Sequence, residues 1–252
     1  MKTACRFAYA QARIHARYAC LPTDADWERL AGARGLAGFF EEARNGALRN
    51  WVKPFSGLSD SHDIEAGLRA FYREHVAEVV AWVPRPWQAA FRWTRWLVLI
   101  PLFDHLARGE AMPAWVSRDH GLHRLFDGKG DLNTARLRRA GVSSLLVSDG
   151  DPAAAWLLEW RQRWPRCRPV YLRNLALLEI LLARHLAEFR RASPETTWAL
   201  RYRLREHLGL LFHQRLLQPA GVFIYLILVL LDLEHLRSEL VGRALFAASE
   251  AT

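Results

Sequence analysis

The chain has 252 residues, a length that suits one large domain or two small ones and allows a substantial buried core. Hydrophobic residues make up 51% and charged residues 24%, which excludes an intrinsically disordered chain, a collagen-like chain and a polytopic membrane protein. The formal net charge is +9, and nearly all of the positive charge is arginine, since the only lysines are Lys2, Lys53 and Lys129.

The cysteines and the N-terminus predict a cytoplasmic protein. Cys5, Cys20 and Cys167 form neither a CxxC motif nor an even framework, so we expect no disulfide scaffold and no zinc knuckle. Arg6 interrupts the N-terminus before an apolar signal-peptide core can form. The longest apolar run covers residues 221–231, which is shorter than the roughly 20 residues that cross a bilayer.

The first strong helical pattern lies between residues 61 and 82. Ile64, Leu68 and Val76 fall on or near one helical face among charged residues. Asp60 offers a side-chain oxygen to the first turn, and Pro84 predicts the end of this helix. A second helix is predicted for residues 87–106, with a kink at the proline in position 101.

Further helices are predicted through the C-terminal half. Asp151 before Pro152 and Ser193 before Pro194 each place a capping oxygen ahead of a proline in the first turn. Long helices follow over residues 172–189 and from 193 onward. The last helix begins after residue 219 and is apolar all round through 231, which predicts a buried helix at the centre. The one candidate strand, residues 142–147, has no partner, so the fold class is predicted to be all-α.

Two kinds of polar cluster raise the question of metal binding or catalysis. Asp119, His120 and His123 contain imidazoles three residues apart, but no further ligand can be assigned, and we expect no metal. The carboxylate pairs at 41–42 and 60–63 are interpreted as capping residues rather than an acid–base pair. Motifs for nucleotide loops, zinc proteases and serine hydrolases are absent, so an enzyme is unsupported without being excluded.

Residues 85–96 alternate arginine with aromatic residues, a mixture that can grip phosphates and stack on bases. The same spacing has a second interpretation. Trp87 and Phe91 are four residues apart, and Trp93 and Trp96 are three apart, as in a helix that buries its aromatic side chains. Core packing is the favoured interpretation, and a basic nucleic-acid-binding protein remains the alternative function.

Segments near both ends of the chain together resemble a known family. Residues 7–17 read Phe-Ala-Tyr-Ala-Gln-Ala-Arg-Ile-His-Ala-Arg, and residues 63–68 read Asp-Ile-Glu-Ala-Gly-Leu. Residues 218–226 read Gln-Pro-Ala-Gly-Val-Phe-Ile-Tyr-Leu, followed by Asp-Leu-Glu-His-Leu-Arg at 232–237 and Gly-Arg at 242–243. In this order the segments are similar to the opening helix, the Ile-Glu helix and the closing pattern of the C-type subunits of A/V-type ATPases, the relatives of the eukaryotic d-type subunits.

The resemblance implies a non-catalytic, all-helical, funnel-shaped protein built from three related helical segments. Such a protein sits on the cytoplasmic face of the membrane rotor ring, receives the tip of the central stalk and binds no cofactor, nucleotide or ion. Arg13 and Arg17 match arginine positions of the family, and Asp232 and Arg237 match its Glu and Arg on the last helix. We expect these four residues either at a partner interface or in internal ion pairs.

This chain also departs from the family pattern. It is shorter than typical members, and residues 104–168 do not align with the family. His235 stands where the family has Asn, and Leu230 and Leu231 replace its Lys-Glu pair. We therefore predict a single all-helical domain over residues 1–252, with candidate helical sub-segments 1–108, 109–168 and 169–252.

Overall fold

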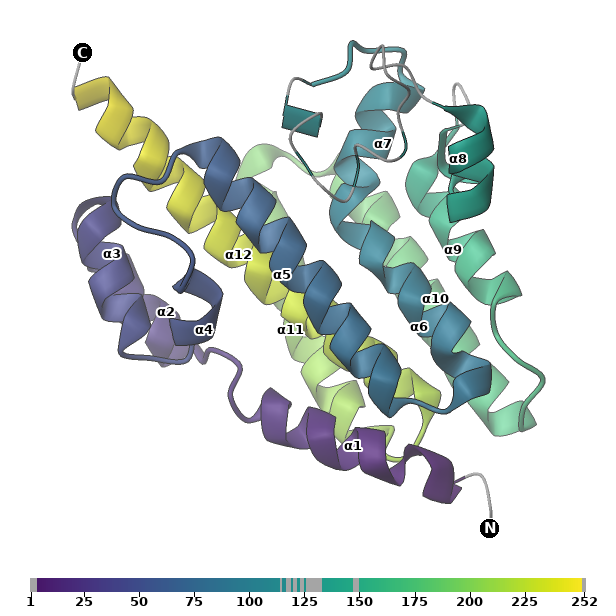
Figure 1. Cartoon of the computed structure of the whole chain (residues 1–252). Coiled ribbons are helices and arrows are strands. Elements are labelled where there is room, and N and C mark those ends of the chain that lie inside the picture. The colour runs from purple at the N-terminus through teal and green to yellow at the C-terminus, as the bar shows by residue number, and fades with distance from the viewer. Residues whose placement is uncertain are drawn as a thin grey trace. The chain divides into compact units, whose positions relative to one another are not determined.

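The computed structural model confirms the predicted all-α fold class (Figure 1). It describes residues 4–113, 115, 116, 119, 122, 125, 133–146 and 150–250, with the side chains of 4–6, 134 and 246–250 excepted. No β-strand occurs among these residues.

Helices therefore account for all the regular structure in the described ranges. The α-helices are α1 (Ala4–Tyr18), α2 (Asp24–Ala31), α3 (Gly35–Arg44), α4 (Arg49–Val52), α5 (Ser61–Trp82), α6 (Gln88–Trp93), α7 (Ile100–Ala107), α8 (Thr134–Ala140), α9 (Pro152–Gln162), α10 (Pro169–Arg191), α11 (Pro194–Gln214) and α12 (Pro219–Glu250). Short 3₁₀ helices span Arg85–Trp87, Thr94–Leu99 and Ser143–Leu146.

The chain divides into two compact units. Unit 1 joins both ends of the sequence, Met1–Arg85 and Arg201–Thr252, and unit 2 is the continuous stretch Pro86–Leu200. Their boundaries differ from the sub-segments 1–108, 109–168 and 169–252 suggested by the sequence, because the last helix packs on α1, α3 and α5 near the other end of the chain.

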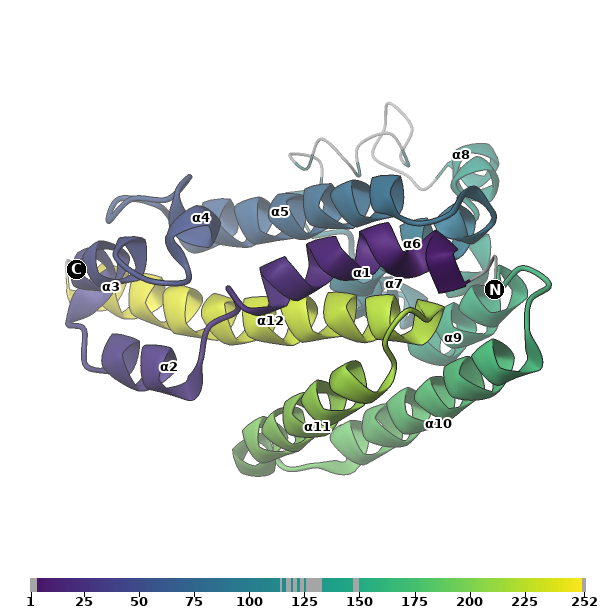
Figure 2. The same cartoon turned by 90° about the horizontal axis from the view of Figure 1, so that it is seen from below.

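Unit 1 is organised around α12, which packs against α5, α1 and α3. Figures 1 and 2 show α5 and α12 side by side, with α1 against both. Residues 219–229, the first eleven of α12, are all buried. This confirms the prediction of a helix that is apolar all round and lies in the core.

Helix α12 is also long and apolar enough, by length and composition alone, to cross a membrane over Pro219–Leu245. The apolar run 221–231 continues into a longer helix than the run itself suggests. However, 78% of the most apolar window of this helix is buried inside the protein. Its apolar surface is therefore largely covered by the neighbouring helices.

Unit 2 is built on tryptophans from α6 and α9. The indole Nε1 of Trp93 donates to the carbonyl oxygen of Trp156 at 3.1 Å, and Trp156 Nε1 donates back to Trp93 O at 3.4 Å. The guanidinium of Arg163 lies 3.8 Å from the Trp93 ring centroid. These reciprocal contacts satisfy both buried indole N–H groups while the rings stay in the core.

Local signals in the sequence account for most helix ends. Helix α5 begins after Asp60, whose Oδ1 accepts from the backbone N–H of Asp63 at 2.7 Å, and it ends before Pro84, as predicted. Asp151 caps α9 through the N–H groups of residues 153 and 154, with Pro152 in the first turn. Helix α11 begins at Pro194, also as predicted.

Two local predictions need correction. The expected helix 87–106 is interrupted by the 3₁₀ segment Thr94–Leu99. Pro101 lacks a backbone N–H, and its ring would clash with the carbonyl four residues earlier in a continuous helix. Helix α7 therefore begins anew at Ile100, with Pro101 in its first turn. The candidate strand at 142–147 contains a 3₁₀ helix, Ser143–Leu146, and position 147 lies outside the described residues.

Candidate functional site: a polar cluster between α1, α5 and α12

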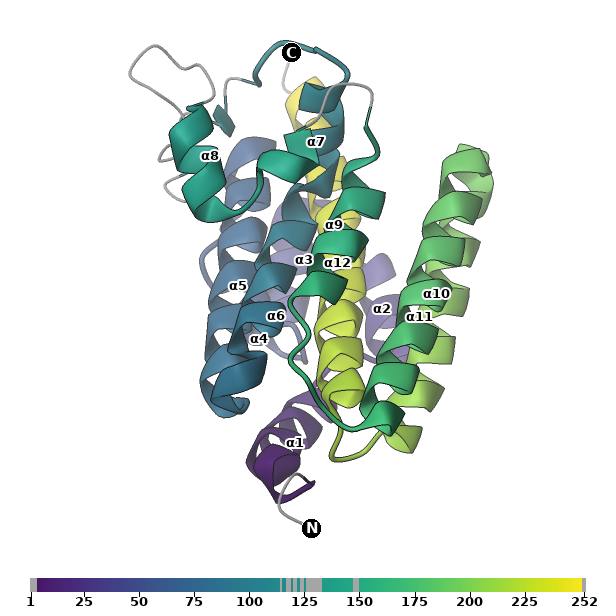
Figure 3. The same ribbon diagram turned by 90° about the vertical axis from the view of Figure 1, so that its right-hand side faces the viewer.

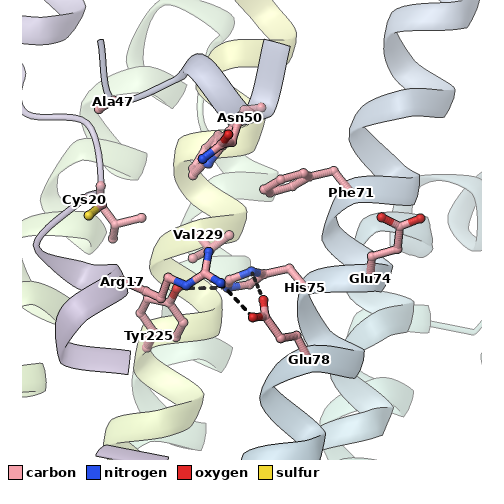
Figure 4. Close-up of a pocket in the computed structure, with 12 residues that line it drawn as sticks. Arg17, Cys20, Ala47, Asn50, Phe71, Glu74, His75, Glu78, Tyr225 and Val229 are labelled. Carbon is pink, nitrogen blue, oxygen red and sulfur yellow. Dashed lines mark hydrogen bonds and ion pairs between the residues drawn. The ribbon is translucent and has the colours of Figure 1, made fainter. Parts of the chain in front are cut away.

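A pocket of about 250 Å³ opens in unit 1 beside a cluster of polar side chains. Its walls come from the end of α1, from α4 and the turn before it, and from one face each of α5 and α12 (Figure 4). Trp51, Phe71 and Val229 give it apolar sides, and the Trp51 and Phe71 ring centroids are 5.5 Å apart. The volume is below the range of about 300–1,000 Å³ that is usual for small-molecule sites.

Four polar side chains join the three long helices at this pocket. The guanidinium Nη2 of Arg17 donates to Glu78 Oε1 at 2.7 Å. His75 places Nδ1 3.9 Å from Glu78 Oε2 and Nε2 2.9 Å from the hydroxyl of Tyr225. The continuous series Arg17–Glu78–His75–Tyr225 therefore links α1, α5 and α12 (Figure 4).

His75 Nε2 and the Tyr225 hydroxyl are within hydrogen-bond distance, and the tautomer of the ring decides which of the two donates. The 3.9 Å between His75 Nδ1 and Glu78 Oε2 is too long for a hydrogen bond, so Glu78 does not fix that tautomer.

Burial keeps this cluster away from acid–base chemistry at neutral pH. Burial, together with the smaller effect of the nearby Arg17 charge, lowers the pKa of His75 to about 4. Burial also raises the pKa of the Tyr225 hydroxyl well above its ordinary value. A general acid or base works best with a pKa near the operating pH, so the geometry favours a structural or binding role.

The two predicted arginines of α1 both reach Glu78 of α5. Arg17 forms the close contact described above, whereas Arg13 Nη2 lies 3.9 Å from Glu78 Oε1. The guanidinium of Arg13 also lies 4.7 Å from the ring centroid of Trp82. Both arginine side chains are 46% exposed, so each forms an internal ion pair and still presents donors at the surface.

Asp232 lies in a different part of unit 1, in an ion pair whose carboxylate is almost sealed from water. Arg205 Nε donates to Asp232 Oδ1 at 2.6 Å, and its Nη2 donates to the carbonyl oxygen of Pro22 at 2.7 Å. The Asp232 side chain is only 1% exposed, and burial raises its pKa to about 6 against the opposing effect of Arg205. The pair ties α11 to α12 and to the segment before α2.

Arg237, the fourth predicted residue, pairs with the Ile-Glu helix. Its Nε and Nη2 donate to Glu65 Oε1 at 2.9 and 2.6 Å. It does not pair with Asp232, which has Arg205 as its partner. All four predicted residues thus take part in ion pairs within unit 1, and their contact with a partner protein remains a prediction.

Sequence reasoning missed the polar residues at the base of the pocket. His75 continues the buried face of α5 that carries Leu68, Tyr72 and Val79, and Tyr225 stands inside the apolar run of α12. A polar side chain in an apolar stripe needs a buried partner, and this signal was available in both segments. Only the packing shows that the two residues are each other's partner.

The remaining chemical candidates are resolved as far as the described residues allow. His120 and His123 lie outside them, and no cluster of three or more metal-ligating side chains occurs within them. Asp60 is a helix cap, as predicted. Glu42 is not a cap: it lies within α3 and its Oε1 is 2.9 Å from Arg29 Nε, so an ion pair explains it.

The aromatic residues of 85–96 are core residues. Trp87, Phe91, Trp93 and Trp96 are at most 6% exposed. Their rings are therefore covered by protein and are not presented to nucleic-acid bases, in agreement with the helical spacing.

Comparison with known proteins gives no further guide. The chain matches no protein-family model, no curated protein and no solved structure.

Proposed function

We propose that the chain is a non-catalytic rotor component of an A/V-type ATPase, peripheral on the cytoplasmic face of the membrane. In this role it connects the central stalk to the membrane rotor ring and transmits torque between them. The funnel-shaped arrangement of three related helical segments, which the resemblance implies, is part of the same proposal.

The observation that carries the proposal is that the segments that resemble this family, although distant in sequence, lie against one another within unit 1. Gln11 of the opening segment accepts from the backbone N–H of Leu217 at 3.1 Å, at the turn that leads into the closing segment. Glu65 of the Ile-Glu segment binds Arg237 of the closing segment at 2.6 Å. The Glu65–Arg237 ion pair joins two positions at which the chain carries the residues of the family pattern.

The mechanics of unit 1 also support a coupling role. Helix α12 is buried along its first eleven residues, and polar links join it to α5 and α11. Close-packed helices with such links transmit strain, because interiors are dense and poorly compressible. Burial lowers the pKa of His75 to about 4, so this one cluster is better suited to joining helices than to acid–base chemistry at neutral pH.

Co-purification tests the proposal. The tagged full-length chain is expressed with the ring and central-stalk proteins of the A/V-type ATPase from the organism that encodes it. We expect the chain to remain with both after detergent extraction. Deleting it is expected to leave ATP hydrolysis uncoupled from ion transport. A chain that elutes alone, together with intact coupling in the deletion strain, would exclude this function.

A charge reversal locates the contact. Arg13→Glu is compared with Arg29→Glu, since both arginine side chains are 46% exposed, lie on helices of unit 1 and form ion pairs at the surface. Only Arg13 belongs to a segment that resembles the family. We expect Arg13→Glu to reduce recovery of the partner proteins about tenfold, as electrostatic complementarity at an interface allows, and Arg29→Glu to leave it unchanged. Equal losses would place the contact elsewhere.

A further inference from the structure

Helix α10 belongs to unit 2 (Figure 3), and one of its faces carries a row of exposed side chains. The row contains five residues: Arg173, Leu177, Ile180, Arg184 and Arg191. They are spaced three, four or seven residues apart, so they line one side of a helix that repeats every 3.6 residues. The row is about 27 Å long at about 1.5 Å per residue. We call these five residues the α10 stripe.

The apolar part of the stripe lacks a cover. Leu177 is 52% exposed and Ile180 64%, and Val170, one turn before the stripe begins, is 46% exposed. None of residues 179–191, all described in the structure, is fully buried, although they include Leu182 and Leu186. A helix this rich in leucine ordinarily buries its apolar side against another element.

Charge gives this surface a preference for its partner. Arg173 and Arg191 stand near the two ends of the helix, and neither forms an ion pair with another described side chain. Arg184, between them, donates from Nε to Glu188 Oε1 at 2.8 Å. The stripe therefore offers an apolar centre between two arginines that form no ion pair within the described part of the chain.

We propose that the α10 stripe binds an amphipathic α-helix of a partner protein, with heptad-spaced apolar residues and acidic side chains opposite Arg173 and Arg191. The alternating four- and three-residue spacing of the stripe is that of a coiled-coil seam, which a second helix can fill. The arginines stand in line with the apolar residues. On a helix that lies in a membrane surface the cations would flank a broader apolar face, so a protein helix fits better.

This inference goes beyond the proposed function and does not depend on it. All the segments that resemble the ATPase family lie in unit 1, whereas the stripe lies in unit 2. Its test uses peptides and the full chain alone, so the two proposals fail independently.

The probe is a fluorescein-labelled peptide of about four heptads, with leucine at positions a and d and glutamate at e and g. The glutamates keep the peptide from pairing with itself. Fluorescence anisotropy measures its binding to the full-length chain. A peptide with lysine in place of each glutamate is the control for charge. We expect the acidic peptide to bind, and its affinity to fall between about 50 and about 300 mM salt because screening weakens exposed charge pairs.

Variants of the chain locate the binding. The double variant Leu177→Glu with Ile180→Glu is expected to weaken binding at least about tenfold, as truncation or repulsion at an interface centre does. Leu158→Glu is the matched control, because Leu158 is 59% exposed on α9 of the same unit, and it is expected to change binding less than about twofold. Circular dichroism checks that each variant keeps its helical content.

Arg173→Glu with Arg191→Glu tests the electrostatic part. This pair is expected to weaken binding of the acidic peptide, to remove its salt dependence and to permit binding of the lysine peptide. The proposal is overturned if the acidic peptide fails to bind, if both peptides bind equally, or if the stripe and control variants behave alike. A membrane surface is the other possible partner, and sedimentation with vesicles of phosphatidylcholine and anionic phosphatidylglycerol tests it. If the chain sediments with the vesicles, the Leu177→Glu, Ile180→Glu variant does not, and the acidic peptide fails to bind, the stripe binds a membrane instead.

Discussion

Removing the positive partner of the buried ion pair Arg205–Asp232 should destabilise unit 1 far more than neutralising the negative one. In Arg205→Met, Asp232 at 1% exposure loses its only close cation among the described residues, so at pH 7 it must hold an uncompensated charge or take up a proton. An uncompensated buried charge costs about 3–5 kcal/mol. In Asp232→Asn the guanidinium, at 26% exposure, still reaches water and still donates to the carbonyl oxygen of Pro22. The cost there is about 1 kcal/mol, that of an ordinary hydrogen bond.

Urea denaturation at pH 7, followed by circular dichroism, measures the two costs. For a slope of about 3 kcal/mol per molar urea, Arg205→Met should lower the midpoint by about 1 M or more. The double variant Arg205→Met with Asp232→Asn should recover much of this loss, since no charge is then buried. The reasoning is refuted if Asp232→Asn is as damaging as Arg205→Met, or if the double variant is no better than Arg205→Met alone.

The pH dependence provides an internal check on the same pair. Burial raises the pKa of Asp232 to about 6 in the folded chain, above the value of 3.8 that it has when unperturbed. Between these values the folded state binds more protons than the unfolded state, so the contribution of Asp232 to stability falls as pH rises from 3.8 to about 6 and then levels off. The hydrogen bond and charge of Arg205 hold the pKa of Asp232 down, so Arg205→Met should raise that pKa further and extend the fall in stability to higher pH. The deficit of Arg205→Met relative to wild type should therefore shrink from pH 7 to pH 5. A deficit that grows at pH 5 would contradict the assignment.

Three other sets of substitutions test separate parts of unit 1. Burial lowers the pKa of His75 from 6.5 to about 4, so stability should be lost as pH falls from 6.5 towards 4 by up to about 3 kcal/mol; His75→Phe should flatten this slope in urea denaturation series. Gly221→Ala should cost about 2 kcal/mol or more, because the added Cβ would lie 2.5 Å from the Arg215 carbonyl oxygen. Gly242→Ala, with open space around it in the same helix, should gain up to about 1 kcal/mol, and thermal melts compare the two. Gln11→Ala should cost about 1–2 kcal/mol by leaving the N–H at the turn into α12 without its acceptor, and hydrogen exchange at that amide should quicken.

Much of the fold could be predicted from local sequence because the determining contacts span only a few residues. Asp60 and Asp151 mark helix starts through their own side-chain oxygens, and Pro84 ends a helix without outside help. The apolar run of α12 predicted its burial for a similar reason, since a helix without a polar face has no side to expose. The prediction of one helix over 87–106 with a kink at Pro101 was wrong, because the 3₁₀ segment Thr94–Leu99 separates α6 from α7 ahead of that proline.

The candidate site was predicted only in part. Arg13, Arg17, Asp232 and Arg237 came from a family likeness, and the alternative of internal ion pairs was open for all of them. The structure supplies their partners, and two of these, Glu78 and Arg205, carry no local mark that distinguishes them from other charged residues on helices. A charge on an amphipathic helix is ordinarily solvated, so sequence alone gives no reason to assign it a partner.

The sequence by itself determined the helices, because caps, prolines and apolar periodicity act over one or two turns of chain. Tertiary structure alone decided which helices meet: α12 lies on α1 and α5, which are far from it in sequence, and His75 reaches Tyr225 across 150 residues. Such pairings depend on how whole apolar faces fit together, and many faces of similar composition compete for each partner. The helical period of α10 is visible in its sequence. Only the packing of unit 2 shows that the α10 stripe is exposed, and the proposal that it binds a partner helix depends on that exposure.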